Sequence, residues 1–440
     1  MDNARALPPL RRIKTTEAMH DASMHASTTI STPLPVKVDT YPEGGWRAWS
    51  IVLGAWLALF SSLGLLSSIA TFHTYLHSHQ LAKYSNGEIG WIFSVYTFVC
   101  FGGGVFIGPI FDKYGPRVLI LVGTVCLVTS LMLLSFCHEY PQFLLTFGIL
   151  GGVGTSLLFT PSIAVVGHWF SLRRGLATGI ATTGGSMGGI AFPLLMNSLF
   201  DRVGWSRTIS VIAMICLVLC GFSTLLLRSR LPPATNAKPR PDIRILREPA
   251  FALTTLGIFL LELSMFIPLT YISSYMVSEG FDTSFSYHIL PILNAGSVLG
   301  RLLAGPWADR FGPFNVNILA VLLSIVACLG VWLPFGSTPQ GIVVFAVIFG
   351  FASGSNISVG PVCIGRLCRT EVYGKYYATA YTSVSFACLV GIPAAGHIVA
   401  HNQGGYWGLI VFTGVVYVGS LAALWAAKVL RVGWGLFERF

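Results

Sequence analysis

Two charged side chains, Glu262 and Arg301, lie well inside long apolar runs of the sequence. Charges held away from water are costly, so such residues usually face a cavity or a charged partner. A guanidinium can donate two parallel hydrogen bonds to a carboxylate, which makes Arg301 a candidate for binding an anion; alternatively, backbone carbonyls or Glu262 satisfy it. A buried carboxyl group favours its neutral form, so Glu262 is a candidate proton carrier. It could equally stay neutral or pair with Arg301.

The runs themselves indicate a membrane protein. The chain is 54% hydrophobic and 10% charged, with a mean hydropathy of +0.72, whereas about a quarter of the residues of a soluble domain are charged. Crossing a bilayer takes roughly 20 apolar residues, and the sequence contains twelve such runs. They lie at about 49–72, 88–111, 118–137, 142–167, 176–200, 207–227, 251–276, 285–308, 315–334, 341–364, 377–400 and 406–428.

Both charged residues lie deep in their runs. Arg301 precedes Asp309, at the end of its run, by eight residues, which is about 12 Å at a helical rise of 1.5 Å per residue. Glu262 lies about 17 Å into its run by the same rise. In an apolar core about 30 Å thick, these depths keep both side chains from reaching the surface easily.

Further polar side chains lie on runs that are expected to line a central cavity. Each can contact a bound molecule or make a hydrogen bond between helices. Together with Arg301 they form the expected binding site for a small-molecule substrate. They are His73, Tyr271, Tyr275, Asn294 and Asn356.

Two short loops between apolar runs have almost the same sequence. Residues 108–116 read GPIFDKYGP and residues 305–313 read GPWADRFGP, which indicates an internal duplication. The loops resemble those between the second and third helices of each half of major facilitator transporters. That resemblance implies a gate at the cytoplasmic face, where these side chains hold neighbouring helices together. The candidate gate residues are Asp112, Lys113, Gly115, Arg117, Asp309, Arg310 and Gly312, joined by Arg173 and Arg174 from another loop.

Lys and Arg are distributed asymmetrically about the predicted runs. With both termini on one side, 23 of the 27 Lys and Arg residues fall on that side, three fall on the other, and Arg301 lies within a run. Loops rich in Lys and Arg stay in the cytoplasm, so both termini are expected there. The net charge of +10 therefore reflects topology, and it gives no reason to expect nucleic-acid binding.

These features divide the chain into five segments. Residues 1–48 are expected to form a disordered cytoplasmic tail, since they are polar and lack a signal-peptide core. Two six-helix bundles, 49–227 and 251–429, are joined by a polar cytoplasmic linker, 228–250, and residues 430–440 form a C-terminal cytoplasmic tail. The nine cysteines form no C-x-x-C pair, so we expect buried thiols and neither a disulfide framework nor a metal site.

Two further stretches resemble the monocarboxylate transporter family of that superfamily. Residues 43–49 read EGGWRAW, and residues 170–189 read FSLRRGLATGIATTGGSMGG; both are similar to signatures of that family, most of all in its fungal branch. The resemblance covers roughly 41–430, and it implies that Arg301, on the eighth helix, binds a carboxylate. The glycines of the second stretch also suit close helix packing, because small residues four positions apart let helix backbones approach.

The sequence departs from this family at two places. Ser297 stands where lactate carriers have an aspartate, and Ser67 or Ser68 stands near the position of a lysine on the first helix. The proton–lactate cycle of the family therefore does not transfer directly. Members of the fungal branch are associated with monocarboxylates, riboflavin or the export of secondary metabolites, so the resemblance leaves the substrate open.

We therefore expect an all-α membrane protein with twelve transmembrane helices in two six-helix bundles, the major facilitator fold. Its expected function is secondary active transport of a small anionic, monocarboxylate-like metabolite by alternating access about a midplane site, with proton coupling left open. The alternatives are a drug or secondary-metabolite efflux antiporter on the same fold and a non-transporting membrane sensor. We expect no enzymatic activity, cofactor, metal or nucleic-acid partner, and a monomer in the plasma membrane.

Overall fold

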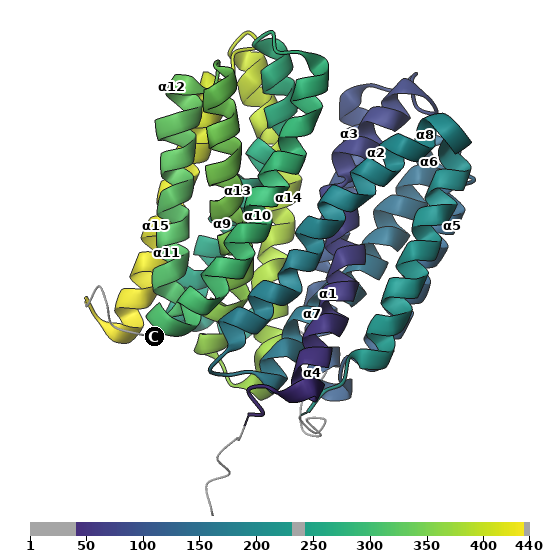
Figure 1. Ribbon diagram of the computed structural model, residues 1–440. Helices are drawn as coiled ribbons and strands as arrows, with labels where there is room; N and C mark the ends of the chain where they lie inside the picture. Colours follow the sequence, from purple (N-terminus) through teal and green to yellow (C-terminus); the bar gives the residue numbers. More distant parts are fainter. Residues whose placement is uncertain (1–40, 231–242, 435–440) are drawn as a thin grey trace, which may run out of the picture. The chain divides into compact units, whose positions relative to one another are not determined.

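The computed structural model describes residues 41–230 and 243–434. Most of the expected N-terminal tail (1–40), the middle of the linker (231–242) and the end of the C-terminal tail (435–440) lie outside the described residues. All regular structure in the described ranges is helical (Figure 1), which confirms the predicted class. The elements are α1 (Gly45–Ser67), α2 (Ile69–Ser78), α3 (Asn86–Gly102), α4 (Gly104–Tyr114), α5 (Arg117–Leu134), α6 (Tyr140–Phe143), η1 (Leu144–Gly151), α7 (Gly152–Trp169), α8 (Arg174–Leu226), η2 (Ile243–Arg247), α9 (Pro249–Ser278), α10 (Thr283–Phe311), α11 (Pro313–Ile325), η3 (Val326–Trp332), α12 (Leu333–Phe335), α13 (Pro339–Leu367), η4 (Thr370–Val372), α14 (Tyr373–His401) and α15 (Trp407–Val432).

In the described ranges, eleven helical segments are long and apolar enough to cross a membrane, and the twelve predicted runs coincide with them over most of their lengths. The numbers differ because α8 contains both the fifth and the sixth run. Gly204 interrupts this helix with φ 76° and ψ 177°, a conformation that glycine adopts without steric cost. Gly184 and Ser223, on either side of Gly204, both contact α1, so the chain turns back at this glycine.

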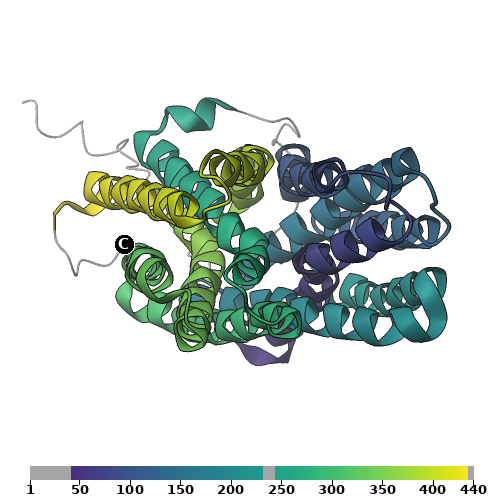
Figure 2. The same ribbon diagram turned by 90° about the horizontal axis from the view of Figure 1, so that it is seen from above.

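We call α1–α8 the N half and α9–α15 the C half. In the N half α8 packs against α1 and α5, while in the C half α10 packs against α13 and α15 against α9. The two halves meet where α8 packs against α10, and where α14 packs against α3 and α4 (Figure 2). Smaller contacts join α8 to α13 and α14 to α7, so a binding site shared by the halves lies around these helices.

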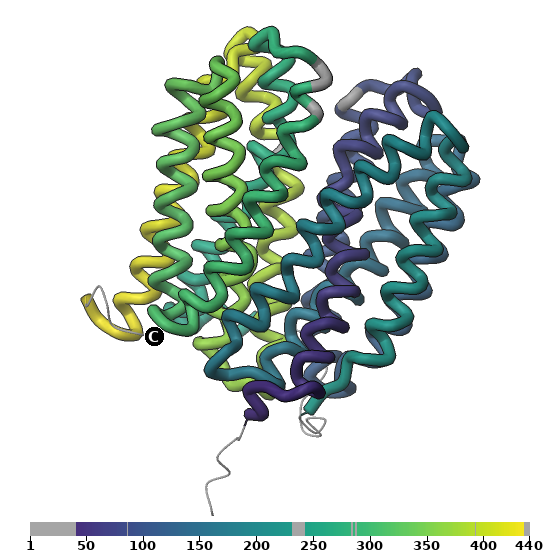
Figure 3. Tube along the Cα trace, in the orientation of Figure 1, coloured from purple at the N-terminus to yellow at the C-terminus, as the bar shows by residue number. Residues whose placement is uncertain are grey.

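The paired loops join equivalent elements of the two halves. The repeated sequences, predicted as loops, are mostly helical: residues 108–114 form the end of α4 and residues 305–311 form the end of α10. The short turns that follow lead into α5 and α11 along the trace of Figure 3. Each turns at a glycine with positive φ, 79° at Gly115 and 90° at Gly312, which a residue with a side chain adopts only under strain. The duplication of the amino-acid sequence therefore extends to the backbone conformation of the turn. The end of the structure where these loops lie, together with the starts of α8 and α14, is called the linker end below.

The glycine-rich stretch of α8 lies directly against α1. A Cβ at Gly184 would collide with the carbonyl oxygen of Trp56, and one at Gly188 would collide with that of Phe60. The two backbones approach this closely only because these positions lack side chains. This confirms the packing role predicted for the stretch, and it fixes which face of α8 remains for α10.

Candidate functional site

Arg301 lies at the contact between the two halves. Its side chain is on α10 and is 5% exposed. Nη1 donates a hydrogen bond to the backbone carbonyl of Thr182 on α8, and Nε donates to Oγ of Ser297, 3.3 Å away, one turn earlier on α10. Ser297 also accepts a hydrogen bond of 3.1 Å from the hydroxyl of Ser186 on α8. The guanidinium is thus held by neutral acceptors from both halves.

The α8 surface around Arg301 is made of small residues. A Cβ at Gly185 would lie 3.3 Å from Nη1 of Arg301, and one at Gly179 would collide with the Arg301 carbonyl oxygen. The stretch that resembles a family signature therefore uses one set of glycines for α1 and another for the helix that carries Arg301.

Glu262 is 4% exposed on α9 and lies within electrostatic reach of Arg301. The two side chains nevertheless form no ion pair within 4.0 Å. The carboxyl group is also within electrostatic reach of Tyr377 and Tyr381 on α14. Glu262 is therefore close enough to Arg301 and to these two tyrosines to interact with them electrostatically.

Aromatic rings from both halves lie around Tyr381. The ring of Tyr381 has its centroid 6.0 Å from that of Phe101 on α3, 5.8 Å from that of Phe159 on α7 and 4.5 Å from that of Tyr377. Phe266, one turn after Glu262 on α9, lies 6.4 Å from Phe101. Such a cluster offers flat apolar faces beside a charged group, an arrangement that suits a planar organic anion.

The predicted polar residues fall into two groups. Asn294 lies two turns before Arg301 on α10, and its Nδ2 would be 3.6 Å from a Cβ at Gly189 of α8, so it faces the N half as Arg301 does. Tyr271 on α9 points its hydroxyl at Gly396 of α14. These two residues lie on helices that meet around the centre.

Two of the other three, Tyr275 and Asn356, lie inside the C half, and the third, His73, lies on α2. Tyr275 is packed against Trp332 and Tyr406 inside the C half, with centroids 5.5 Å apart in both cases. Asn356 is 2% exposed and donates to Ser324, also within the C half. His73 lies on α2 beside Phe93 of α3, with ring centroids 5.8 Å apart. The structure therefore does not bring Tyr275 or Asn356 to Arg301.

Several residues of the central cluster were missed by the sequence analysis. Tyr373, Tyr377 and Tyr381 recur every four residues, which places them on one helix face, and this spacing is a signal that could have been used. Phe101, Phe159 and Ser186 carry no such signal, because Phe and Ser are common in apolar runs. Among the described residues, no group of three or more His, Cys, Asp or Glu side chains is placed to hold a metal ion.

At the linker end, the aspartates of the paired loops bind helix starts in the opposite half. Asp309 accepts hydrogen bonds from the backbone N–H groups of Gly175 and Leu176, at 2.7 and 2.8 Å. Asp112 accepts from Gly374 at 3.0 Å and from Lys375 at 2.9 Å. A carboxylate at a helix start satisfies free N–H groups and interacts favourably with the helix dipole. Each loop of the duplication thus joins its own half to the other.

The basic residues of these loops are placed differently. Lys113 and Arg310 lie over the rings of the next residues in the chain, Tyr114 at 5.2 Å and Phe311 at 5.4 Å. Arg117 and Arg173 are exposed, whereas Arg174 is buried. Of the predicted basic gate residues, Arg174 is therefore the one that the structure inserts between helices.

The two stretches that resemble family signatures contact each other. Oε1 of Glu43 accepts from the backbone N–H of Ser171 at 2.8 Å and from that of Leu172 at 2.7 Å, while Oε2 accepts from Arg173 at 3.1 Å. One carboxylate thereby satisfies three backbone donors in the loop before α8. The acidic residue at the start of the first stretch positions the loop that opens the second.

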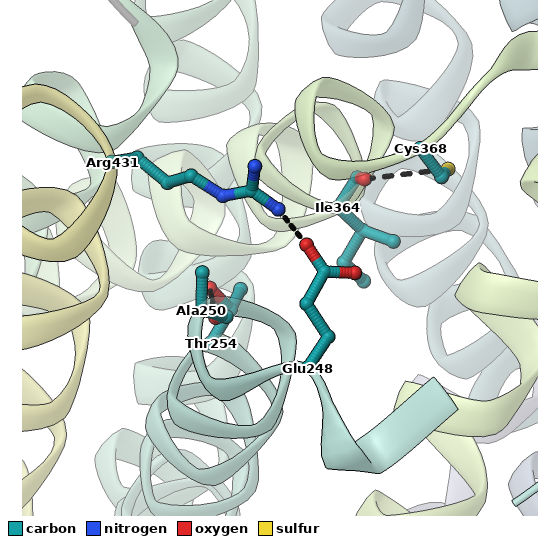
Figure 4. A network of polar contacts seen from close by, with 6 residues as sticks. All are labelled: Glu248, Ala250, Thr254, Ile364, Cys368 and Arg431. Atoms are coloured by element: carbon teal, nitrogen blue, oxygen red, sulfur yellow. Dashed lines mark hydrogen bonds and ion pairs between the residues drawn. The ribbon is translucent and has the colours of Figure 1, made fainter. Parts of the chain in front are cut away.

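An ion pair joins the ends of the first and last helices of the C half. Arg431, at the end of α15, contacts Glu248, which precedes α9 (Figure 4). It lies at the surface and fixes the point where the linker enters the C half. We assign it no part in binding.

These observations describe a polytopic helical membrane protein built from two similar halves, with its charged and aromatic side chains gathered where the halves meet. The chain belongs to the Major Facilitator Superfamily, whose family model matches residues 51–338 and 294–432. It is therefore an integral, multi-pass membrane transporter for a small molecule.

Known proteins of similar sequence and fold agree. The chain is 35% identical over 413 residues to "Agnestins efflux protein AgnL12" of Paecilomyces divaricatus, covering 93% of each chain. It is 33% identical over 421 residues to "Riboflavin transporter MCH5" of Saccharomyces cerevisiae, covering 90% of this chain and 81% of that protein. Its fold is similar to the crystal structure of the human organic anion transporter MFSD10 (TETRAN), with a TM-score of 0.67 at 16% identity, covering 86% of this chain and 98% of the other.

Proposed function

We propose that the protein is a secondary transporter that binds a small organic anion at Arg301. The observation that carries this proposal is the guanidinium's setting: it is buried between the halves, and its hydrogen bonds go to a carbonyl and a hydroxyl. A guanidinium has five N–H donors, so an anionic group can bind it without displacing an acidic partner. The rings of Tyr381 and Phe101 supply apolar faces for the rest of the cargo.

Within the superfamily, we assign this chain to the monocarboxylate-like branch. Support comes from Glu43, which ties one family-like stretch to the other, and from Arg301 on the helix where that family binds its carboxylate. Ser297 in place of an aspartate argues for a cargo or a coupling different from those of lactate carriers. Glu262 is the proposed proton carrier, because it is buried beside the cation without being paired to it.

We propose that the linker end faces the cytoplasm and that both termini lie there, in the plasma membrane. The asymmetry of Lys and Arg supports this orientation. The hydrogen bonds of Asp112 and Asp309 then close the cytoplasmic side in this state, with the six-helix halves 49–227 and 251–429 as the moving bodies. Opening must break both sets of bonds, so these aspartates act in the gate rather than in cargo binding.

Export of a secondary metabolite is a second candidate function. It is favoured by the similarity to a protein named as an efflux protein for agnestins. The similarity to a riboflavin transporter gives no direction of transport. Both directions use the same site, so they differ in which side supplies the cargo and the driving proton.

Reconstitution into proteoliposomes tests the proposal. Radiolabelled benzoate, lactate and riboflavin are offered with a pH gradient of either sign, and the variant Arg301→Ala is the matched control. We expect the wild type to transport an anionic or flat aromatic probe and Arg301→Ala not to transport it. Transport that is equal in wild type and Arg301→Ala contradicts a binding role for Arg301. A proton-driven exit of the probe favours export, and proton-driven entry favours uptake.

A further inference from the structure

The first residues of α8 and α14 occupy equivalent positions in the two halves. Asp309 binds the second and third residues of α8, and Asp112 binds the second and third residues of α14. The first residue is Arg174 in α8 and Tyr373 in α14. The duplication thus places a cation in one half and an aromatic ring in the other at the same position.

These two side chains contact each other. Cζ of Arg174 lies 3.9 Å from the centroid of the Tyr373 ring. Arg174 is 8% exposed and Tyr373 is 1% exposed, and Nη2 of Arg174 makes no hydrogen bond. A desolvated guanidinium over an aromatic face is a favourable cation–π contact. It joins the N half to the C half between the two aspartate contacts.

A glycine from each half makes room for the guanidinium. A Cβ at Gly167, near the end of α7, would lie 2.6 Å from Nη2, and a Cβ at Gly365, near the end of α13, would collide with Cζ. We call Gly167, Gly365 and the ring of Tyr373 the Arg174 slot. Because both halves line this slot, the guanidinium fits in it only while the halves are together at the linker end.

The stability of α8 alone does not explain an arginine at its first position. A positive charge at a helix start interacts unfavourably with the helix dipole. Asp309 offsets part of this by placing a carboxylate at the same N-terminus. The benefit of Arg174 must therefore come from its contacts outside its own helix, which are those of the slot.

We propose that Arg174 and Tyr373 form the central contact that holds the linker end closed, and that each transport cycle separates and re-forms this pair. This inference rests on the proposed alternating access. It adds to the aspartate contacts an interaction that two identical repeats could not make, because one copy must be cationic and the other aromatic. The different residues at this equivalent position of the two repeats therefore make a contact that closes the linker end.

A native thiol reports on this contact. Cys368 lies at the linker end, partly buried between α13 and α14, and donates to the carbonyl of Ile364 (Figure 4). Burial raises the pKa of Cys368 to about 12, and Arg174 opposes this rise. Loss of the Arg174 charge alone would make the thiol less acidic and slower to react. Faster alkylation in an Arg174 variant therefore reports greater exposure of Cys368, not a more acidic thiol.

The experiment follows alkylation of Cys368 by N-ethylmaleimide in the purified full-length protein, with peptides quantified by mass spectrometry. The variants are Arg174→Met and Tyr373→Leu, each of which removes the cation–π contact. Each is expected to raise the alkylation rate about tenfold or more, the change that corresponds to losing a desolvated cation–π pair. Because the two residues act as one pair, the alkylation rate of the double variant should be only slightly higher than that of the faster single variant.

Three controls make the result specific. Tyr373→Phe keeps the ring and loses the hydroxyl, which donates to Pro361 and interacts with Arg174, so it should react much more slowly than Tyr373→Leu. The exchange Arg174→Tyr with Tyr373→Arg should recover part of the protection. Cys216 and Cys220 are fully buried in the N half, so they react only if a variant unfolds. If Arg174→Met or Tyr373→Leu unfolds, the alkylation rates of the Phe variant and the exchange variant test the proposal instead.

The proposal is overturned if Arg174→Met leaves the rate unchanged, or if Tyr373→Phe accelerates it as much as Tyr373→Leu. It is also overturned if the single effects multiply in the double variant. None of these readings needs a cargo, so a negative result here is distinct from a failure of the transport assay.

Discussion

The charge of Arg301 is balanced differently from that of an arginine in a salt bridge. Its recorded acceptors, the Thr182 carbonyl and the Ser297 hydroxyl, are neutral. An aspartate at position 297 would neutralise the guanidinium through direct contact, whereas the serine orients it and leaves the charge in place. An arriving anion is then attracted to a cation that is already positioned, which lowers the cost of binding.

Arg301→Lys should fail nearly as badly as Arg301→Ala. Lysine keeps the charge, but it cannot reach Thr182 and Ser297 together and still present a planar pair of donors to the cargo. Losing a charge-assisted hydrogen bond typically costs about 1.5–3 kcal/mol, roughly ten- to a hundred-fold in affinity. Equilibrium binding of the transported probe to the purified variants measures this. Full activity of the lysine variant would rule out a binding role.

Glu262→Gln separates proton coupling from charge balance. If Glu262 carries the proton, the variant should bind the probe about as well as the wild type and exchange it across the membrane, but a pH gradient should no longer drive accumulation. Uptake into proteoliposomes with and without an imposed gradient measures both properties. If the carboxylate only balances Arg301, the double change Arg301→Leu with Glu262→Gln should restore transport, and the coupling role would then be abandoned.

At the level of elements, two helix starts carry the closure of the linker end. α8 begins in the N half and is bound by Asp309 from the C half, while α14 begins in the C half and is bound by Asp112 from the N half. A helix start has free N–H groups and a partial positive charge. The carboxylates therefore hold the halves together at two places, and the charges of Lys375 and Arg366 interact favourably with them.

Asp112→Asn and Asp309→Asn should each weaken the closed state by about 1 kcal/mol, the usual size of a charge–dipole interaction at a helix start, or about fivefold in the closed-to-open ratio. Turnover should slow while the half-saturating concentration of the transported probe changes little. Asp201→Asn, an exposed residue in α8 far from the linker end, is the matched control. A large loss of affinity with normal turnover would point to a binding role instead.

Some of these elements could be predicted from the sequence, and others could not. Charge and length gave the membrane helices, and repeated letters gave the paired loops, because both signals are local. The hydrogen-bond partners of Asp112 and Asp309 lie more than 130 residues away in the sequence. No local sequence pattern predicts them. Polar residues such as Tyr275 and Asn356 show which helices carry hydrogen-bonding groups but not which neighbour each faces, so the structure put these two inside the C half.

For the molecule as a whole, the hydrogen bonds between the halves have a clear order along the helices. Among the described residues they run from Tyr41, which bonds Thr370 at 2.7 Å, through the aspartate contacts to Arg301 and Ser186 at mid-helix. Asn294, two turns farther on, approaches α8 through Gly189. This order fits a state in which the linker end is closed, and the proposed orientation then makes the opposite end the open side.

The orientation itself is the last prediction, and it concerns the whole chain. The 23-to-3 distribution of Lys and Arg predicts that the segment 228–250 lies in the cytoplasm, since basic loops resist translocation. A protease-cleavable tag inserted at residue 240 should be protected in sealed right-side-out vesicles and cut after detergent is added. The same tag inserted at Gly404, in the loop between α14 and α15 at the opposite end, should be cut in the intact vesicles. Cleavage of the residue-240 tag from outside would reverse the topology, and with it the assignment of Asp112 and Asp309 to a cytoplasmic gate.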